Sequence, residues 1–181
     1  MTIDYIASTQ AWLKTIVIGL NVCPFARREV ERGRVKFELE TSTDVAACLE
    51  NLILQCECLD QDDNIETTLL IYANAFSEFD DYLDFVAIVQ DLLEAEHYDG
   101  VYQLATFHPN YCFEGATEDD AANFTNRSPF PMLHLLRESS VTEAVAHYPN
   151  PDTIPVTNIT LMRQIGLRTL QATLATCYVT S

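Results

Sequence analysis

The chain has 181 residues, of which 48% are hydrophobic and 20% are charged, and its formal net charge is -17. The high hydrophobic share excludes disorder as the dominant state, and the length predicts a single domain over residues 1–181. With 27 acidic residues and only 10 Lys and Arg, the chain is not expected to bind nucleic acid, because that affinity comes largely from basic side chains that neutralise phosphates.

Hydrophobic periodicity predicts alternating helices and strands in the first part of the chain. The expected helices cover Ile3–Leu20, a segment that starts at Thr43 or Asp44, and a segment from Ser77 or Asp80 to about His97. The expected strands cover Val35–Glu40, Thr67–Ala73 and Val101–Phe107, of which the second is nearly continuous in apolar residues and should be central. This alternation predicts an α/β (or α+β) fold, with a small mainly parallel sheet of three to four strands flanked by about five to six helices.

The second part of the chain begins with residues 109–127, which show no periodicity, and loops of this length are often functional. Ser128 followed by Pro129 is typical of a helix start and predicts a helix that continues through Met132–Arg137. The capping-box pattern Ser140–Glu143 predicts another short helix, to about His147. A last helix is expected from Thr157 or Asn158, with its inward face formed by Met162, Ile165, Leu170 and Leu174.

The charges are distributed unevenly along these elements. No Lys or Arg lies between Phe37 and Asn126, whereas 21 of the 27 acidic residues lie in the stretch from Glu38 to Asp120. Apart from Lys14, which stands alone, the basic residues form one group before this stretch and a looser group after it. The first comprises Arg27, Arg28, Arg32, Arg34 and Lys36, and the second comprises Arg127, Arg137, Arg163 and Arg168. Since an acidic protein repels anions at long range, arginines that gather in a pocket would oppose the average field and mark a site.

The N-terminal sequence lacks the basic segment and cleavable apolar core of a signal peptide. Its longest apolar run, Ile16–Leu20, is too short to cross a bilayer. The six cysteines form no C-x-x-C motif, and a chain of this size does not need disulfides. We therefore expect reduced thiols, a cytoplasmic location and no membrane partner.

His108 directly follows the third expected strand, and ligands of open α/β sheets bind at the carboxyl ends of strands. An imidazole there can exchange a proton near neutral pH, although a histidine that only caps loop backbone is the alternative. Asn126, Arg127 and Ser128 precede the expected helix start, where free N–H groups favour an anion. The planar fork of Arg127 suits a carboxylate or phosphate, and the alternative is a capped helix with a surface arginine.

His134 and Arg137 are three residues apart and would share one face of the expected helix. A buried arginine needs a partner, which could be a structural carboxylate, the commoner case, or a substrate anion. His134 alone is more often a hydrogen-bonded core histidine than a catalyst. Cys23 follows the first expected helix, directly before Pro24 and close to Arg27. In such a position a thiol could have a lowered pKa and act as a nucleophile, but a buried structural thiol is the commoner role.

Three segments of the sequence resemble a bacterial family known as domain-of-unknown-function family 1415. They are GLNVCPFA (Gly19–Ala26), YQLATFHPNY (Tyr102–Tyr111) and NFTNRSPFPMLHLLRE (Asn123–Glu138). The resemblance spans most of the chain but implies no activity. It implies that a shared pattern includes Cys23, Pro24, His108, Asn126, Arg127, Ser128, His134, Arg137 and Glu138. The family often has Gln at the position of Cys112, which disfavours this thiol as a required metal ligand.

We expect the candidate residues to line one cleft, formed by His108, Arg127, His134 and Arg137 with Asn126 and Cys23 at its margin. The first hypothesis is an enzyme that holds a small anionic metabolite with Arg127, Arg137 and a helix N-terminus, with His108 and His134 in acid/base roles. The second is a noncatalytic module in which the same arginines hold a ligand or an acidic partner segment. The third is a metal-binding protein that uses His108 and His134 with a thiol or carboxylate. No motif predicts a cofactor, and no feature indicates an oligomeric state.

Overall fold

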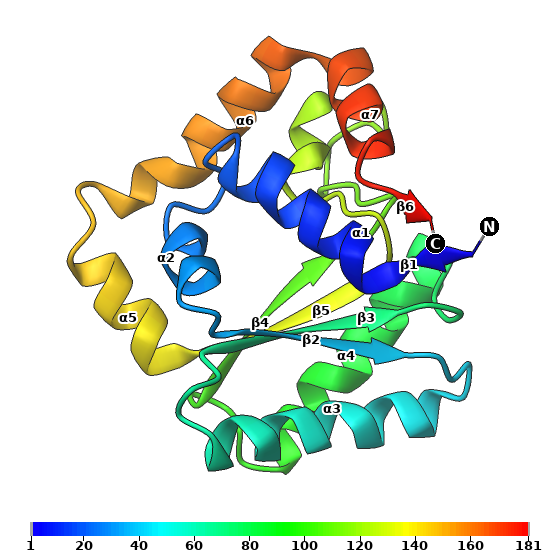
Figure 1. Ribbon diagram of the computed structural model, residues 1–181, viewed down its shortest axis with the longest axis vertical. Coiled ribbons are helices and arrows are strands. Elements are labelled where there is room, and N and C mark those ends of the chain that lie inside the picture. Colours follow the sequence, from blue (N-terminus) through cyan, green and yellow to red (C-terminus); the bar gives the residue numbers. More distant parts are fainter. Residues whose placement is uncertain (1, 181) are drawn as a thin grey trace.

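The structure is a computed structural model that describes residues 2–180, and a four-stranded sheet lies at its centre (Figure 1). The strands, in the order β2-β3-β5-β4, are Val35–Glu40 (β2), Thr67–Tyr72 (β3), Met132–Arg137 (β5) and Tyr102–Phe107 (β4). β2 and β3 are parallel, whereas β5 is antiparallel to both β3 and β4. The prediction of a mainly parallel sheet is therefore wrong, because the sheet is mixed.

The expected alternation of strands and helices is nevertheless present. The helix Val45–Gln61 (α3) connects β2 to β3, and the helix Phe79–Ala95 (α4) connects β3 to β4. Since β3 and β4 both run antiparallel to β5, the strands β2, β3 and β4 all point in the same direction. β5 runs the opposite way and occupies the gap between β3 and β4. The sheet is mixed and not parallel because β5, which was expected to be a helix, is a strand that runs opposite to the other three.

Met132–Arg137 was misassigned because its sequence, MLHLLR, has no clear period. A central strand is covered on both faces and therefore reads as a continuous apolar run, which cannot be distinguished from a buried helix by pattern alone. Ser128 does not cap a helix, because its hydroxyl donates to the carbonyl of Phe130 at 2.6 Å. The next helix, α5, begins already at Glu138 and extends to Ala146, so the Ser140–Glu143 pattern lies within a helix and does not start one.

Seven α-helices surround the sheet within residues 2–180, where five to six were predicted. Besides α3, α4 and α5, they are Tyr5–Trp12 (α1), Ala26–Glu31 (α2), Ile154–Ile165 (α6) and Leu167–Ala175 (α7). The expected C-terminal helix is divided into α6 and α7 because Gly166 has a φ of +85°, outside the helical region. The shorter elements are a π-helical segment Leu13–Ile18 (η1), the 3₁₀ turns Ala121–Thr125 (η2) and Pro151–Thr153 (η3), and the paired terminal strands Ile3–Asp4 (β1) and Val179–Thr180 (β6).

Helices cover both faces of the sheet and bury a separate core on each (Figure 1). Successive residues of a strand point to opposite faces, so Leu133 and Leu135 pack toward α3 and α4, whereas Met132 packs toward α1 and η1. Trp12 and Ile16, expected on the buried side of the first helix, are each only 1% exposed. All six residues of β3 are buried, which confirms its expected central position.

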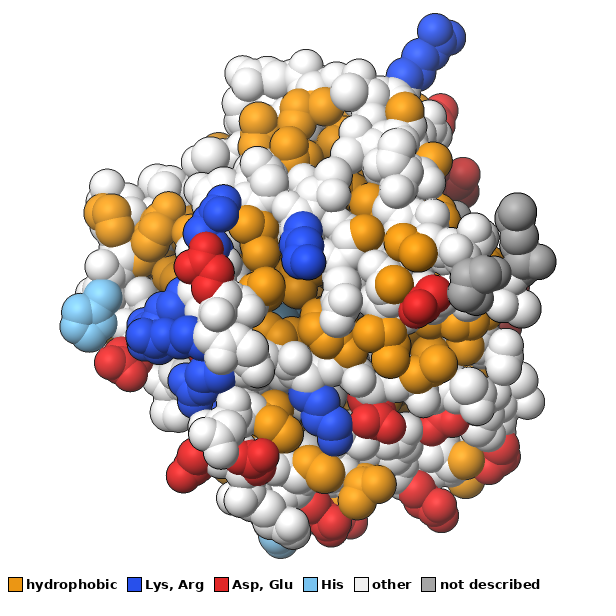
Figure 2. Space-filling view, viewed as in Figure 1, with side chains coloured by type: hydrophobic (Ala, Val, Ile, Leu, Met, Phe, Trp, Pro, Cys, Tyr) orange, Lys and Arg blue, Asp and Glu red, His pale blue; other side chains and the backbone are white. Residues whose placement is uncertain are grey.

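Acidic and basic side chains lie on different regions of the surface. In the view of Figure 2, acidic side chains gather over the α3 side of the molecule, while basic side chains lie mainly over α1 and α2, beside exposed apolar groups. Within the described part of the chain, no helix has both the length and the apolar character needed to cross a membrane.

Tyr82 connects α4 to the ends of both β4 and β5, and it provides a test of this sheet. Its buried hydroxyl donates to the carbonyl of Met132 at 2.7 Å and accepts from the backbone N–H of Phe107 at 3.1 Å. The substitution Tyr82→Phe leaves both backbone groups without this partner, so we expect the free energy of unfolding in urea to fall by about 1–3 kcal/mol. The matched change Tyr98→Phe, which removes a hydroxyl bonded to Asp60 near the surface, should cost less. Equal losses would contradict the role given to Tyr82.

Candidate functional site

His108 lies at the end of β4, as the sequence predicted, but it is completely buried and both ring nitrogens are hydrogen-bonded. Nδ1 accepts the backbone N–H of Asn110 at 3.0 Å, so Nε2 carries the proton and donates to the carbonyl of Phe76 at 2.9 Å. Burial lowers the pKa of His108, and hydrogen bonding to the Phe76 carbonyl opposes this only partly. The neutral ring therefore joins the loops that follow β3 and β4.

Arg127 lies close to His108 in the fold, because the backbone N–H of His108 donates to the carbonyl of Asn126 at 3.2 Å. The guanidinium donates through Nε to the carbonyl of Tyr111 at 3.0 Å and through Nη2 to the carbonyl of Glu118 at 2.8 Å. It also lies 5.1 Å from the ring centre of Phe124. These contacts use Nε and Nη2 to hold residues 109–127 in place, and desolvation lowers the pKa of Arg127.

The neighbours of Arg127 have similar roles. Asn126 donates through Nδ2 to the carbonyl of Thr106 at 3.0 Å, and buried Ser128 bonds to Phe130 as described above. The structure thus brings together His108, Asn126, Arg127 and Ser128, as expected from the sequence. Their polar atoms, however, mainly bind backbone groups of the loops around them. The expected helix N-terminus at Pro129 is absent, since the first element after it in the described chain is the strand β5.

His134 and Arg137 do not share a face, and this part of the prediction is wrong. Both lie on β5, three positions apart, and side chains at that spacing in a strand point to opposite faces of the sheet. Arg137 therefore lies on the α3 side, where it donates to the carbonyls of Leu59, Asp62 and Ile65 at the end of α3. Its partners are structural backbone groups, and a cation at a helix C-terminus is also favoured by the helix dipole. The expected single cleft of four residues is not formed.

His134 lies on the opposite side of the sheet, and its Nε2 is 2.5 Å from the Thr67 hydroxyl. That hydroxyl donates to the carbonyl of Leu135, so Nε2 acts as the donor in this pair. Desolvation lowers the pKa of His134 to about 4.

Cys23 is half-buried against the core on the α1 side. Burial raises the pKa of its thiol, although hydrogen bonds from the backbone of Phe25 and Ala26 partly oppose this shift. A raised pKa does not favour Cys23 as a nucleophile.

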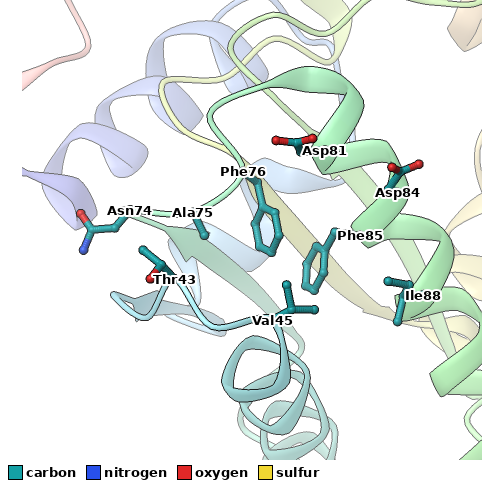
Figure 3. A pocket seen from close by; sticks show the side chains of 9 residues that line it. All are labelled: Thr43, Val45, Asn74, Ala75, Phe76, Asp81, Asp84, Phe85 and Ile88. Carbon is teal, nitrogen blue, oxygen red and sulfur yellow. The ribbon is translucent and has the colours of Figure 1, made fainter.

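A separate depression, here called the strand-end pocket, lies where β2 and β3 end (Figure 3). Its volume is about 400 Å³, and its lining comprises Thr43, Val45, Asn74, Ala75, Phe76, Asp81, Asp84, Phe85 and Ile88. These residues come from the start of α3, the loop after β3 and the first turns of α4. Because β2 and β3 are parallel, their carboxyl ends meet at one edge of the sheet, where ligands of α/β proteins bind.

The strand-end pocket combines an aromatic surface with negative charge. The rings of Phe76 and Phe85 stack with their centres 4.0 Å apart and their planes 17° apart. Figure 3 shows them in the middle of the pocket, with Asp81 and Asp84 on the neighbouring turns of α4. Phe76 has a φ of +60°, a left-handed conformation that is an outlier for a bulky residue and that recurs at functional sites.

Two apolar side chains at this pocket remain in contact with solvent. Val45 is 41% exposed and Ile88 is 46% exposed, although both are large aliphatic residues. These residues were not predicted from the sequence, because the rule on strand ends was applied there only to the loop after β4. The same rule applies to residues 74–76 after β3, and this signal could have pointed to the pocket.

Within residues 2–180, His, Cys, Asp and Glu side chains form no group of three or more that could hold a metal ion. His108 also has both nitrogens engaged in hydrogen bonds to backbone groups.

These features define a mixed α/β protein with a small acidic and aromatic pocket at one edge of its sheet. Residues 4–172 match the family described as Protein of unknown function (DUF1415). Since the match covers most of the chain, the protein belongs to this family. No curated protein and no solved structure matches the chain.

The lowered pKa of His134 predicts a pH dependence of stability. Because the folded protein favours the neutral ring, stability should be complete above the unfolded pKa of about 6.5 and decline as the pH falls toward 4. We expect the substitution His134→Gln to reduce this decline between pH 6.5 and 5, while parent and variant run parallel between pH 7 and 8. The measurement is urea unfolding across this pH range. Parallel curves over the whole range would contradict the prediction.

The contacts of Arg137 predict a structural effect of its removal. The substitution Arg137→Met keeps the aliphatic stem but leaves the carbonyls at the end of α3 without their charged donor, so we expect a loss of about 2 kcal/mol in unfolding free energy. The same change at Arg163, which pairs with Asp120 on the surface, should have a clearly smaller effect. If Arg137→Met unfolds like the parent in urea, the guanidinium does not stabilise the end of α3.

Proposed function

We propose that the protein is a noncatalytic binding module for a small organic cation, an ammonium group attached to an apolar body, in the strand-end pocket. The observation that carries this proposal is the half-buried ring of Phe76, backed by the buried ring of Phe85, in a pocket whose lining also includes Asp81 and Asp84. Aromatic faces attract cations through their quadrupole, and the carboxylates supply the opposite charge. The apolar body of the ligand would contact Val45 and Ile88, which are otherwise exposed.

The electrostatics of the whole molecule supports the same class of ligand. A net charge of -17 attracts cations at long range and repels anions. The residues that line the pocket include two carboxylates and no Lys or Arg, so the local charge has the same sign as the average field. A cation would therefore be favoured both on approach and when bound.

The size and chemistry of the pocket favour binding over catalysis. A volume of about 400 Å³ lies at the lower end of the range for small-molecule sites. The titratable residues of its lining are Asp81 and Asp84, and no His, Cys or Lys accompanies them as a second acid, base or nucleophile. The residues of the first hypothesis, His108 and Arg127, are instead engaged with loop backbone.

An enzyme that acts on a small anion through His108 and Arg127 stays a prediction, as do the metal-binding alternative, the cytoplasmic location and the bacterial origin. The enzyme hypothesis needs a free nitrogen on His108, so this ring would have to exchange a backbone partner for substrate.

The proposal can be tested with 2-phenylethylamine, which is cationic at pH 7, and the neutral analogue 2-phenylethanol. We expect calorimetry or NMR titration to show tighter binding of the amine, with an affinity that decreases as salt screens the carboxylates. The variant Asp84→Asn should weaken the amine about threefold, a magnitude typical of one partly exposed ion pair, and should leave the alcohol unchanged.

A matched control is Asp91→Asn, which makes the same change two turns further along α4, at a position that does not line the pocket. It should bind the amine like the parent. The proposal fails if the alcohol binds as tightly as the amine, or if Asp84→Asn and Asp91→Asn have equal effects.

A further inference from the structure

We propose a second ligand site, for a small anionic amphiphile, in the groove between the α1–η1 segment and the edge strand β2. The groove has a volume of about 330 Å³. Its apolar wall is formed by Leu13 and Val30 from the helices and by Val35 and Phe37 from β2, while Gln10 and Lys14 form its polar rim. We call it the α1–β2 groove.

The apolar part of the groove is a stretch of sheet surface at a free edge. β2 pairs with β3 on one side only and is the outer strand of the described sheet. The carbonyls of Arg34 and Glu40 accept hydrogen bonds from residues next to and within the β3 segment. In a parallel pair, alternate residues bond to the same neighbour, so the backbone groups of Val35 and Phe37 point to the free side. The groove thus offers apolar side chains at an outer edge of the described sheet.

The charge at the groove is opposite to that of the rest of the molecule. Lys14 is exposed, is the only charged residue in the lining, and forms no ion pair within residues 2–180. Arg32, which flanks the groove residue Gly33, is also exposed, but its charge is paired with Glu29 at 4.0 Å. Figure 2 shows basic side chains over α1 and α2 around exposed apolar groups, in contrast to the acidic surface below the sheet.

The charge and the shape of the groove together indicate which ligand it would bind. A free ammonium group at the rim of an apolar groove complements a molecule with one anionic head, such as a carboxylate, and a short apolar body. One lysine is too little for a nucleic acid, which needs many phosphate contacts. In a protein with a net charge of -17, a local positive rim is also the place where an anion meets the least repulsion. The Lys14 side chain would lie over the head group while the body packs on Val35 and Phe37.

This site is independent of the strand-end pocket. The side chains of Val35 and Phe37 lie on the α1 face of the sheet, with the core that includes Trp12, whereas Phe85 belongs to the core on the α3 and α4 face. The two sites share no lining residue. Either proposal can therefore fail without the other.

The test uses octanoate and octylammonium, which have the same chain and opposite charges. We expect NMR titration of the ¹⁵N-labelled protein to show octanoate-induced shifts that are confined to residues 10–14 and 30–37. The variant Lys14→Gln should weaken octanoate about threefold to fivefold, and Lys14→Glu should weaken it further. Because Lys14 is exposed, both variants should fold like the parent, which the unshifted remainder of the spectrum would verify.

The matched control is Arg168→Gln, which removes one positive charge from an exposed position of α7 that does not line the groove. It should change the affinity for octanoate by less than a factor of two. The proposal is overturned if octanoate does not bind, if its shifts lie at other residues, if octylammonium shifts the groove residues with equal affinity, or if Lys14→Gln and Arg168→Gln are equivalent.

Discussion

The fold depends on the position of β5, which pairs antiparallel with β3 on one side and with β4 on the other. In the described sheet, β4 is joined to the remaining strands only through β5. This pairing also determines where the side chains of β5 point. His134 is directed to one face and Arg137 to the other, so two residues that a helix would place together end in different layers. Both then act as internal partners, one for Thr67 and one for the end of α3.

The connection between β4 and β5 joins two of the three segments on which the resemblance to the family rests, Tyr102–Tyr111 and Asn123–Glu138. The chain leaves β4 at Phe107 and returns to the adjacent β5 at Met132, and the long loop between them must be held against the sheet. His108 and Arg127 provide this support through hydrogen bonds to loop carbonyls and amides, and Trp12 adds a bond from its indole N–H to the carbonyl of Arg127 at 3.0 Å. His, Asn and Arg side chains at a strand end can therefore serve to hold a loop in place instead of binding a substrate.

Most of the architecture could be predicted from the sequence, because β2, α3, β3, α4 and β4 carry strong periodic patterns and the start of α3 carries an effective cap in Asp44. The MLHLLR segment could not be assigned, since its pattern fits a buried strand and a buried helix equally, and Ser128-Pro129 imitates a helix start. The proximity of His108 to Asn126 and Arg127 was predictable, but the occupation of their polar atoms by backbone was not. The strand-end pocket depends on the left-handed turn at Phe76 and on the packing of its ring against Phe85, which no local pattern encodes.

The uneven charge of the sequence is also uneven in space: Asp81 and Asp84 line the strand-end pocket at α4, and Lys14 lines the groove beside β2. The arrangement of the four-stranded sheet depends on Met132–Arg137 being a strand. The most direct test is therefore a set of nuclear Overhauser contacts for this segment. The structure predicts backbone contacts between Leu135 and Leu104 and between His134 and both Ala105 and Leu69, which are paired in the ladder. Contacts between residues three apart within 132–137, as in a helix, with none across to β3 or β4, would contradict the account.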